Sequence, residues 1–184
     1  MSKKLCIDPG HGMSNTKHGV YDPGATSGEW TEAAIVLQLA LTIKWYFAQK
    51  GETIYLTRAD DHTDDPVGGR NELAEGHGCT HFIALHCNAA DAQSAHGTEA
   101  YYRNDSKMAR EIMDLAVAAF KTNSRGIHSE GHSQHTRLAV MDFKGHVCLL
   151  EVGFITNQED RDAMLNRDMR IDFAKRLYEW WEKQ

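Results

Sequence analysis

Short apolar runs alternate along the chain with segments in which apolar residues recur at helical spacing. The runs have the length and composition of buried strands, and they cover residues 4–7, 53–56, 81–86, 98–102, 138–141 and 147–151. Apolar residues three or four positions apart predict longer helices, which run from Ile35 to Tyr46, from Met108 to Ala119 and over residues 168–182. Shorter helices are predicted around residues 69–75 and after Asn157, with a polar loop over residues 126–135.

Polar residues mark where several of these helices begin and end. Thr31 is a candidate N-cap for the first long helix, and Gly51 follows its end. Asn104 or Asp105 would cap the second long helix. The alternation of strands and helices predicts a single α/β domain over residues 1–184. We expect a twisted, mostly parallel or mixed central sheet with helices on both faces.

Polar residues also follow the ends of several predicted strands. In sheets of this kind, ligands bind outside the carboxyl ends of the strands. That rule selects four places in the chain, namely residues 8–11, Arg58, residues 86–88 and Glu151.

Composition and charge exclude several classes of protein. The 184 residues carry a formal net charge of −6, which lacks the basic character of a nucleic-acid-binding surface. No stretch approaches the ~20 apolar residues that span a bilayer. The apolar run near the N-terminus is too short for a signal peptide, so we expect synthesis in the cytoplasm. The 4 cysteines form no CxxC pair, which favours reduced, buried thiols over disulfides.

The chain contains the residue types that a catalytic metal site requires. A hydrolytic zinc ion needs about three protein ligands and an open position for water. Two neutral imidazoles and one carboxylate leave the ion positively charged, so that it can acidify water, and a further carboxylate can accept the proton. His11 and His86 follow strands, Glu32 begins a helix, and Glu151 ends an apolar strand.

A series of short motifs, in order along nearly the whole chain, resembles the N-acetylmuramoyl-L-alanine amidases of the amidase-3 family. The motifs are Cys6–Gly12, Asp22–Ala25, Thr31–Glu32, Leu56–Arg58, Arg70, Phe82–Ala89, Gly97–Tyr102, Arg125–Gly126 and Leu150–Asn157. Two departures are visible. Met13 stands where a second glycine is usual, and Gly145-His146 stands where a proline often precedes the final strand, which suggests a looser loop.

The resemblance implies both a site and a reaction. It implies Zn²⁺ bound by His11, Glu32 and His86, with Glu151 as the catalytic residue. The substrate would be peptidoglycan, cleaved at the amide between the lactyl group of N-acetylmuramic acid and L-alanine. A peptidoglycan hydrolase of this kind would act at the cell wall, with no nucleic-acid partner and no membrane insertion, and we expect a monomer.

Several candidate residues allow a second interpretation. Glu32 could instead stabilise the start of its helix, and Glu29 is a rival ligand. Asn88, Arg58 and Arg70 are candidate substrate-binding residues, although the two arginines fit ion pairs that hold loops better. We expect His128, His132 and His135 to form a solvated loop rather than a second zinc site, and Trp180–Trp181 to place one ring in the core and one outside.

The biological role also has alternatives. A phage endolysin released through a membrane hole fits a compact chain without a signal peptide. A bacterial wall-remodelling amidase domain is the alternative. A non-catalytic wall-binding module would be expected to lose Glu151 or a ligand, and a two-metal exopeptidase would need more ligands than the sequence offers.

Overall fold

The computed structural model describes residues 3–133 and 136–184, and its centre is a mixed six-stranded sheet. The strand order is β6-β1-β7-β10-β8-β9. These strands are β1 (Leu5–Pro9), β6 (Tyr55–Leu56), β7 (His81–Asn88), β8 (Thr98–Tyr102), β9 (Ser124–Ser129) and β10 (His146–Phe154). All neighbours are parallel except β8 and β10, so β8 and β9 run against the other four strands. The predicted α/β class is confirmed.

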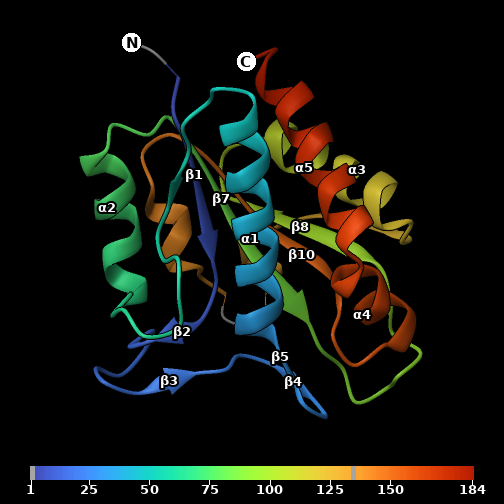
Figure 1. Cartoon of the computed structure of the whole chain (residues 1–184). Coiled ribbons are helices and arrows are strands. Elements are labelled where there is room, and N and C mark those ends of the chain that lie inside the picture. Colours follow the sequence, from blue (N-terminus) through green and yellow to red (C-terminus); the bar gives the residue numbers. More distant parts are fainter. Residues whose placement is uncertain (1–2, 134–135) are drawn as a thin grey trace.

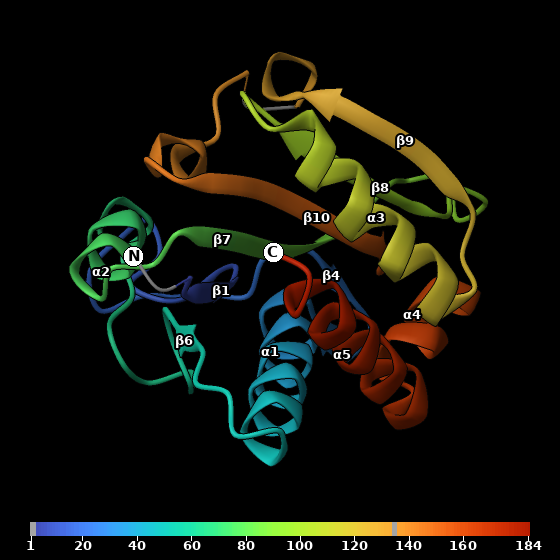
Figure 2. The same cartoon turned by 90° about the horizontal axis from the view of Figure 1, so that it is seen from above.

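Helices cover both faces of this sheet, and the larger core lies on the face covered by four helices. These are the long helices α1 (Glu32–Gln49), α3 (Ser106–Phe120) and α5 (Arg167–Trp181) and the shorter α4 (Gln158–Leu165). The other face is covered by α2 (Arg70–Gly76) and the 3-10 turn η3 (Ala139–Asp142), with a further 3-10 turn, η1 (Val67–Gly69), leading into α2. Figure 1 shows α1 beside α5, and Figure 2 shows both on one side of β7 and β10.

The alternation of side chains along the central strands divides the two cores. Ile83 and Leu85 of β7 pack into the larger core, whereas Phe82 and Ala84 pack into the smaller one. Because both faces are covered, these strands read as continuous apolar runs in the sequence. The cysteines Cys6, Cys79, Cys87 and Cys148 are free and buried, as expected.

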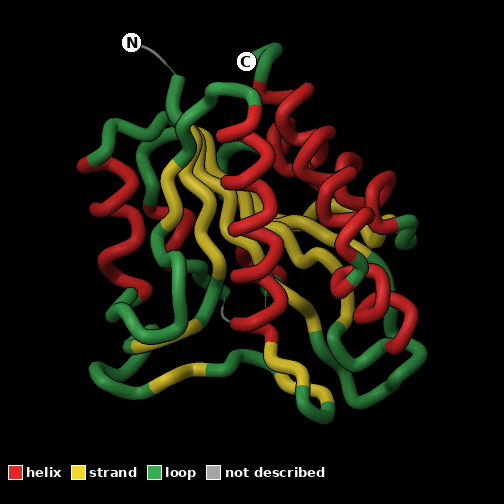
Figure 3. Tube along the Cα trace, viewed as in Figure 1, coloured by secondary structure: helices red, strands yellow, loops and turns green. Residues whose placement is uncertain are grey.

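Two small hairpins follow β1 at the carboxyl edge of the sheet. They pair β2 (Gly12–Met13) with β3 (Tyr21–Asp22), and β4 (Thr26–Ser27) with β5 (Trp30–Thr31). Figure 3 shows them below the sheet, at the end where β1 finishes. Thr31 then caps α1 through its side-chain oxygen, as predicted. The hairpins occupy a region in which the sequence pattern predicts no helix or strand.

Two of the sequence-based element assignments are wrong. Residues 138–141 were expected to form a strand, but Ala139–Asp142 is the 3-10 turn η3. Val140 and Met141 bury in the smaller core without pairing to a strand, so apolar composition alone misled the prediction. Residues 124–129, predicted mostly as polar loop, form the edge strand β9. An edge strand of polar residues lacks the apolar pattern that marks buried strands.

The C-terminal tryptophans also differ from expectation. Trp180 and Trp181 are 8% and 2% exposed, so neither ring faces solvent. The indole of Trp180 donates a hydrogen bond to Glu111, 2.8 Å away, which satisfies its polar atom in the core. No helix within the described residues is long and apolar enough to span a bilayer.

The segment before β10 is tightly packed against β7, in contrast to the looser loop expected there. A Cβ at Gly145 would lie 2.4 Å from the carbonyl oxygen of Thr80. The backbone N–H of His146 donates to that same oxygen at 3.0 Å, a bond that a proline at this position could not make. The close approach of the two backbones therefore explains the glycine.

Acid should destabilise the fold through His81. Burial, together with the charge of His146 stacked on it, lowers the pKa of His81 to about 4. The unfolded chain takes up this proton first, near pH 6.5, so stability falls between pH 6.5 and about 4. At about 1.4 kcal/mol per pH unit, the loss attributable to His81 reaches ~3 kcal/mol.

Urea unfolding at pH 7 and pH 4.5 measures this effect. The variant His81→Gln removes the titrating group, so it should lose clearly less stability than the wild type over the same interval. An identical loss in the two proteins would show that other groups cause the acid sensitivity.

Candidate metal centre

Three side chains from distant parts of the sequence meet at the carboxyl edge of the sheet. His11 follows β1, Glu32 is the first residue of α1, and His86 lies near the end of β7. One nitrogen or oxygen atom from each lies within 4.8 Å of the others. Within the described residues, this is the one group of three or more metal-binding side chains with such geometry. The rival Glu29 is exposed and lies outside it.

Glu32 connects the other two residues. Its Oε1 lies 2.9 Å from Nδ1 of His86, and its Oε2 lies 3.1 Å from Nε2 of His11. Burial alone would raise the pKa of Glu32, but the hydrogen bonds and charges of the two histidines outweigh it and hold the pKa well below its usual range. The carboxylate is therefore ionised at neutral pH, as a metal ligand must be.

Backbone donors fix the Glu32 carboxylate in place. The N–H of Cys87 donates to Oε1 and the N–H of Ala25 donates to Oε2, both at 2.9 Å. Each oxygen thus has one backbone donor and one imidazole neighbour. This arrangement ties the start of α1 to β7 and to the segment between β3 and β4.

Asp22 orients His11, a role that the sequence pattern does not reveal. Its Oδ2 lies 3.1 Å from Nδ1 of His11 and accepts a hydrogen bond from Asn15 at 2.6 Å. A carboxylate on one imidazole nitrogen fixes the ring so that the other nitrogen can bind a metal. Asp22 belongs to one of the quoted motifs, but only the folded β2–β3 hairpin brings it next to His11.

Two glycines allow the backbone to approach these side chains closely. A Cβ at Gly10 would lie 2.3 Å from Cε1 of His86, and a Cβ at Gly24 would lie 2.6 Å from Oε2 of Glu32. Gly24 also has a φ of +66°, which favours glycine. Both positions therefore need glycine for the three side chains to meet.

Arg58 and Arg70 hold the turn that carries His11. Arg58 is 2% exposed and donates to the carbonyl oxygens of Pro9 and Gly10 at 2.9 and 2.8 Å. Arg70 is 1% exposed and donates to Asp8 and to the carbonyl oxygen of His11 at 2.9 and 2.7 Å. Neither arginine lines the cavity at this site, so these contacts favour the loop-holding interpretation.

Glu151 lies beside the three residues and shares their cavity. It stands opposite His86 in the parallel pairing of β10 with β7. The cavity has a volume of about 340 Å³, and Oε2 of Glu151 is buried there without a hydrogen-bond partner among the described residues. Burial, and then the charges of Glu32 and Glu99, raise the pKa of Glu151 well above its usual range. Such an atom is suited to accept or donate a proton.

Glu99 lies behind the cavity and holds two of its lining residues. It faces Glu151 in the antiparallel pairing of β8 with β10 and is 5% exposed. Its carboxylate accepts hydrogen bonds from Asn88, Tyr101 and Arg125 at 2.8, 2.9 and 2.7 Å. Asn88 and Tyr101 line the cavity and are held in place by this network.

His128 and His132 of the polar segment do not belong to this group of metal-binding side chains. His128 belongs to β9 and His132 to η2 (Glu130–His132), with ring centroids 6.5 Å apart. His132 pairs with Ser129 at 2.8 Å, and the described residues around it include no metal-binding group. His135, the third histidine of this set, lies outside the described residues.

The donor set at the centre fits a zinc-like divalent ion. Two imidazole nitrogens and one ionised carboxylate converge, and a fourth residue places an unpaired oxygen in the same cavity. Three ligands of this kind, with space for water, are typical of catalytic rather than structural zinc.

The chain is similar to several known proteins. The family model described as Amidase_3, N-acetylmuramoyl-L-alanine amidase, matches residues 5–180. An uncharacterized cell wall amidase of Bacillus anthracis is 29% identical over 96% of this chain and 34% of its own length. The N-acetylmuramoyl-L-alanine amidase LytC of Bacillus subtilis is 26% identical over 89% of this chain and 32% of its own. The chain thus spans about a third of the length of these relatives.

Solved structures show the same fold. The catalytic domain of CwlV, an N-acetylmuramoyl-L-alanine amidase from Bacillus (Paenibacillus) polymyxa, superimposes with a TM-score of 0.82 at 24% identity and covers 100% of both chains. Cwp6 from Clostridium difficile has a TM-score of 0.79 at 28% identity, covering 97% of this chain and 29% of that one.

Removing the Asp22 carboxylate should weaken metal binding without removing a ligand. In Asp22→Asn, His11 loses the partner that fixes its ring, so zinc affinity should fall by about 10- to 100-fold. Competition with a chromogenic chelator measures the dissociation constant. Asp114→Asn, at an exposed aspartate on α3, is the matched control. Equal affinities in both variants would contradict the role of Asp22.

Proposed function

Because the chain belongs to the N-acetylmuramoyl-L-alanine amidase family Amidase_3, we propose that it hydrolyses the bond between the lactyl group of N-acetylmuramic acid and L-alanine in peptidoglycan. The observation that supports this most directly is the convergence of His11, Glu32 and His86 beside the unpaired oxygen of Glu151. In this proposal residues 1–184 form a single catalytic domain.

The proposed cofactor is Zn²⁺, held by His11, Glu32 and His86. When bound, the ion would supply Lewis acidity toward a water molecule and the substrate carbonyl. The ionised Glu32 compensates part of its charge, and Asp22 and the backbone donors of Cys87 and Ala25 keep the ligands oriented.

Glu151 is the proposed acid–base residue. Its Oε2 accepts a proton from the attacking water, whose oxygen forms the new bond to the lactyl carbonyl carbon. The same proton then passes to the alanine nitrogen as the amide bond breaks, so that a neutral amine leaves. A raised pKa makes the Glu151 carboxylate a stronger base toward the attacking water.

Asn88 is the proposed substrate-binding residue among the three expected from the sequence. Its side chain lines the cavity and is anchored by Glu99, with Tyr101 beside it. We assign Arg58 and Arg70 to positioning the His11 turn, because their guanidinium groups donate hydrogen bonds to backbone carbonyl oxygens and to the carboxylate of Asp8.

The proposed place of action is the cell wall, since two relatives are named as cell wall or muramoyl amidases. A role as a phage endolysin or as a bacterial remodelling domain stays a prediction, as does the monomeric state. The catalytic domain of the CD27L endolysin shares the fold with a TM-score of 0.67 at 20% identity.

Replacing Glu151 should slow catalysis strongly and leave the metal in place. In Glu151→Gln, turnover should fall by about 10²- to 10⁴-fold, because the proton acceptor is lost. Mass spectrometry of digested peptidoglycan measures release of stem peptides, and elemental analysis measures zinc per chain. Glu179→Gln, at an exposed residue of α5, is the control. Loss of zinc in the Glu151 variant would make this residue a ligand instead.

Removing the metal should stop the reaction and lower thermal stability. Zinc at 100 to 1,000 times its dissociation constant would add about 3–4 kcal/mol to the free energy of unfolding. Melting curves with and without a chelator measure this shift, and stem-peptide release reports activity. His86→Ala should show no response to zinc. Full activity of the wild type in excess chelator would contradict a metal mechanism.

A further inference from the structure

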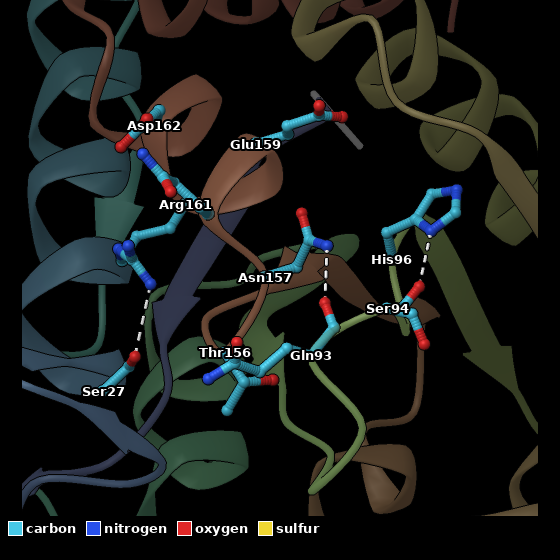
Figure 4. A pocket seen from close by; sticks show the side chains of 10 residues that line it. Ser27, Gln93, Ser94, His96, Thr156, Asn157, Glu159, Arg161 and Asp162 are labelled. Carbon is cyan, nitrogen blue, oxygen red and sulfur yellow. Dashed lines mark hydrogen bonds between the residues drawn. The ribbon is translucent and has the colours of Figure 1, made fainter.

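Two cavities near the carboxyl edge of the sheet differ in their walls. The larger, of about 780 Å³, lies at the start of α4, and Figure 4 shows the hydrogen bonds that join its segments: Asn157 donates to the carbonyl oxygen of Gln93, and Arg161 donates to Ser27. All of its lining residues are exposed or half-buried. The cavity around Glu151, of about 340 Å³, is different because buried oxygen atoms without partners belong to its walls.

Ser133 supplies one of these oxygen atoms. Its Oγ is buried and has no hydrogen-bond partner among the described residues, as is the case for Oε2 of Glu151. Both residues line the same cavity. A buried hydroxyl group without a partner raises the free energy of a protein, and a hydrogen bond from a ligand would remove that penalty. The site therefore has an unused hydrogen-bonding group in the same cavity as its proposed proton acceptor.

Arg103 determines where Ser133 lies. It directly follows β8, and its Nε and Nη2 both donate to the carboxylate of Glu130 in η2, with 3.0 Å between Nη2 and Oε2. The backbone N–H of Ser133 donates to the carbonyl oxygen of Glu130 at 2.9 Å. Glu130 thus connects the guanidinium group to the residue that lines the cavity.

The same guanidinium group also holds η3. Its Nη1 donates to the carbonyl oxygen of Met141 at 3.0 Å and to the carboxylate of Asp142 at 2.7 Å. The N–H of Leu138, which lines the cavity just before η3, donates to Oε2 of Glu130 at 3.1 Å. One side chain that does not itself line the cavity therefore fixes both 3-10 turns to the end of β8.

We propose that Ser133 is a further substrate-binding residue, and that Arg103 is the positioning residue that holds it at the cavity. The inference rests on the proposed amidase function. A serine hydroxyl can donate and accept a hydrogen bond, so its partner is a carbonyl oxygen or an amide N–H of the muramoyl peptide beside the bond that is cleaved.

Steady-state kinetics with soluble glycan fragments that carry L-Ala-γ-D-Glu-L-Lys test the role of Ser133. The variant Ser133→Ala should raise KM by roughly three- to tenfold, the effect of one lost hydrogen bond, with kcat changed less than about twofold. Ser106→Ala, at the exposed first residue of α3, should behave as the wild type.

Thermal unfolding separates substrate binding from a role in the fold. Because Oγ of Ser133 has no partner among the described residues of the free protein, Ser133→Ala should not lower the melting temperature. A lower melting temperature together with an unchanged KM would assign the hydroxyl group to the fold and would overturn the inference.

The variant Arg103→Gln tests the positioning role. It should raise KM in the otherwise wild-type protein and have a clearly smaller effect on KM in Ser133→Ala, because the hydrogen bond that it positions is already absent there. Zinc affinity should be the same in all these variants, and Arg110→Gln, at an exposed residue of α3, is the control. Equal effects of Arg103→Gln on KM in the two backgrounds would show that Arg103 does not act through Ser133.

A binding measurement distinguishes failure of this inference from failure of the proposed function. The same fragments are titrated calorimetrically into Glu151→Gln protein, and adding Ser133→Ala should raise the dissociation constant by the factor seen in KM. If the wild type releases no stem peptide from peptidoglycan or from the fragments, the proposed function is overturned, and this inference with it. If the wild type releases stem peptides but Ser133→Ala changes neither KM nor the dissociation constant, only the inference is overturned.

Discussion

The carboxylate of Glu32 is the interaction on which the site depends. Each of its oxygens accepts one backbone N–H and faces one imidazole, so that a single side chain joins the β3–β4 segment, α1 and β7. A buried charge would be costly without such partners. Here its position at the first residue of an 18-residue helix adds a favourable dipole. His11 and His86 are therefore held on either side of one carboxylate.

Buried arginines extend the same constraint to the His11 turn. Residues 9–11 leave the sheet with carbonyl oxygens that have no strand to pair with, and Arg58 and Arg70 satisfy several of them. His11 itself has a φ of 63°, a conformation that this support makes tolerable. Polar groups that look like candidates for substrate contact in the sequence are thus used to build the turn.

The central strands and the long helices could be predicted because buried strands and amphipathic helices leave periodic patterns. That His11, Glu32, His86 and Glu151 lie together could be predicted because three of them follow or end strands. The edge strand β9 could not be predicted, because its polar residues lack the apolar pattern of a buried strand. The η3 turn could not be predicted either, because Val140 and Met141 have the apolar composition of a strand.

Asp22 and Glu99 lie in the conspicuous motifs, but the sequence does not indicate what they do. Their partners, His11 and Asn88, are 11 residues away in each case, and only the folded hairpin and sheet bring them together.

The reversed direction of β8 gives the cavity around Glu151 walls with separate origins. One wall, with His11, Glu32 and His86, comes from segments at β1, α1 and β7, and the other includes Tyr101, which comes from a strand that runs the opposite way. Glu99 lies on that reversed strand and holds both Tyr101 and Asn88 of β7. A change at Glu99 therefore alters the cavity on both sides without removing any of the three side chains that meet at Glu32.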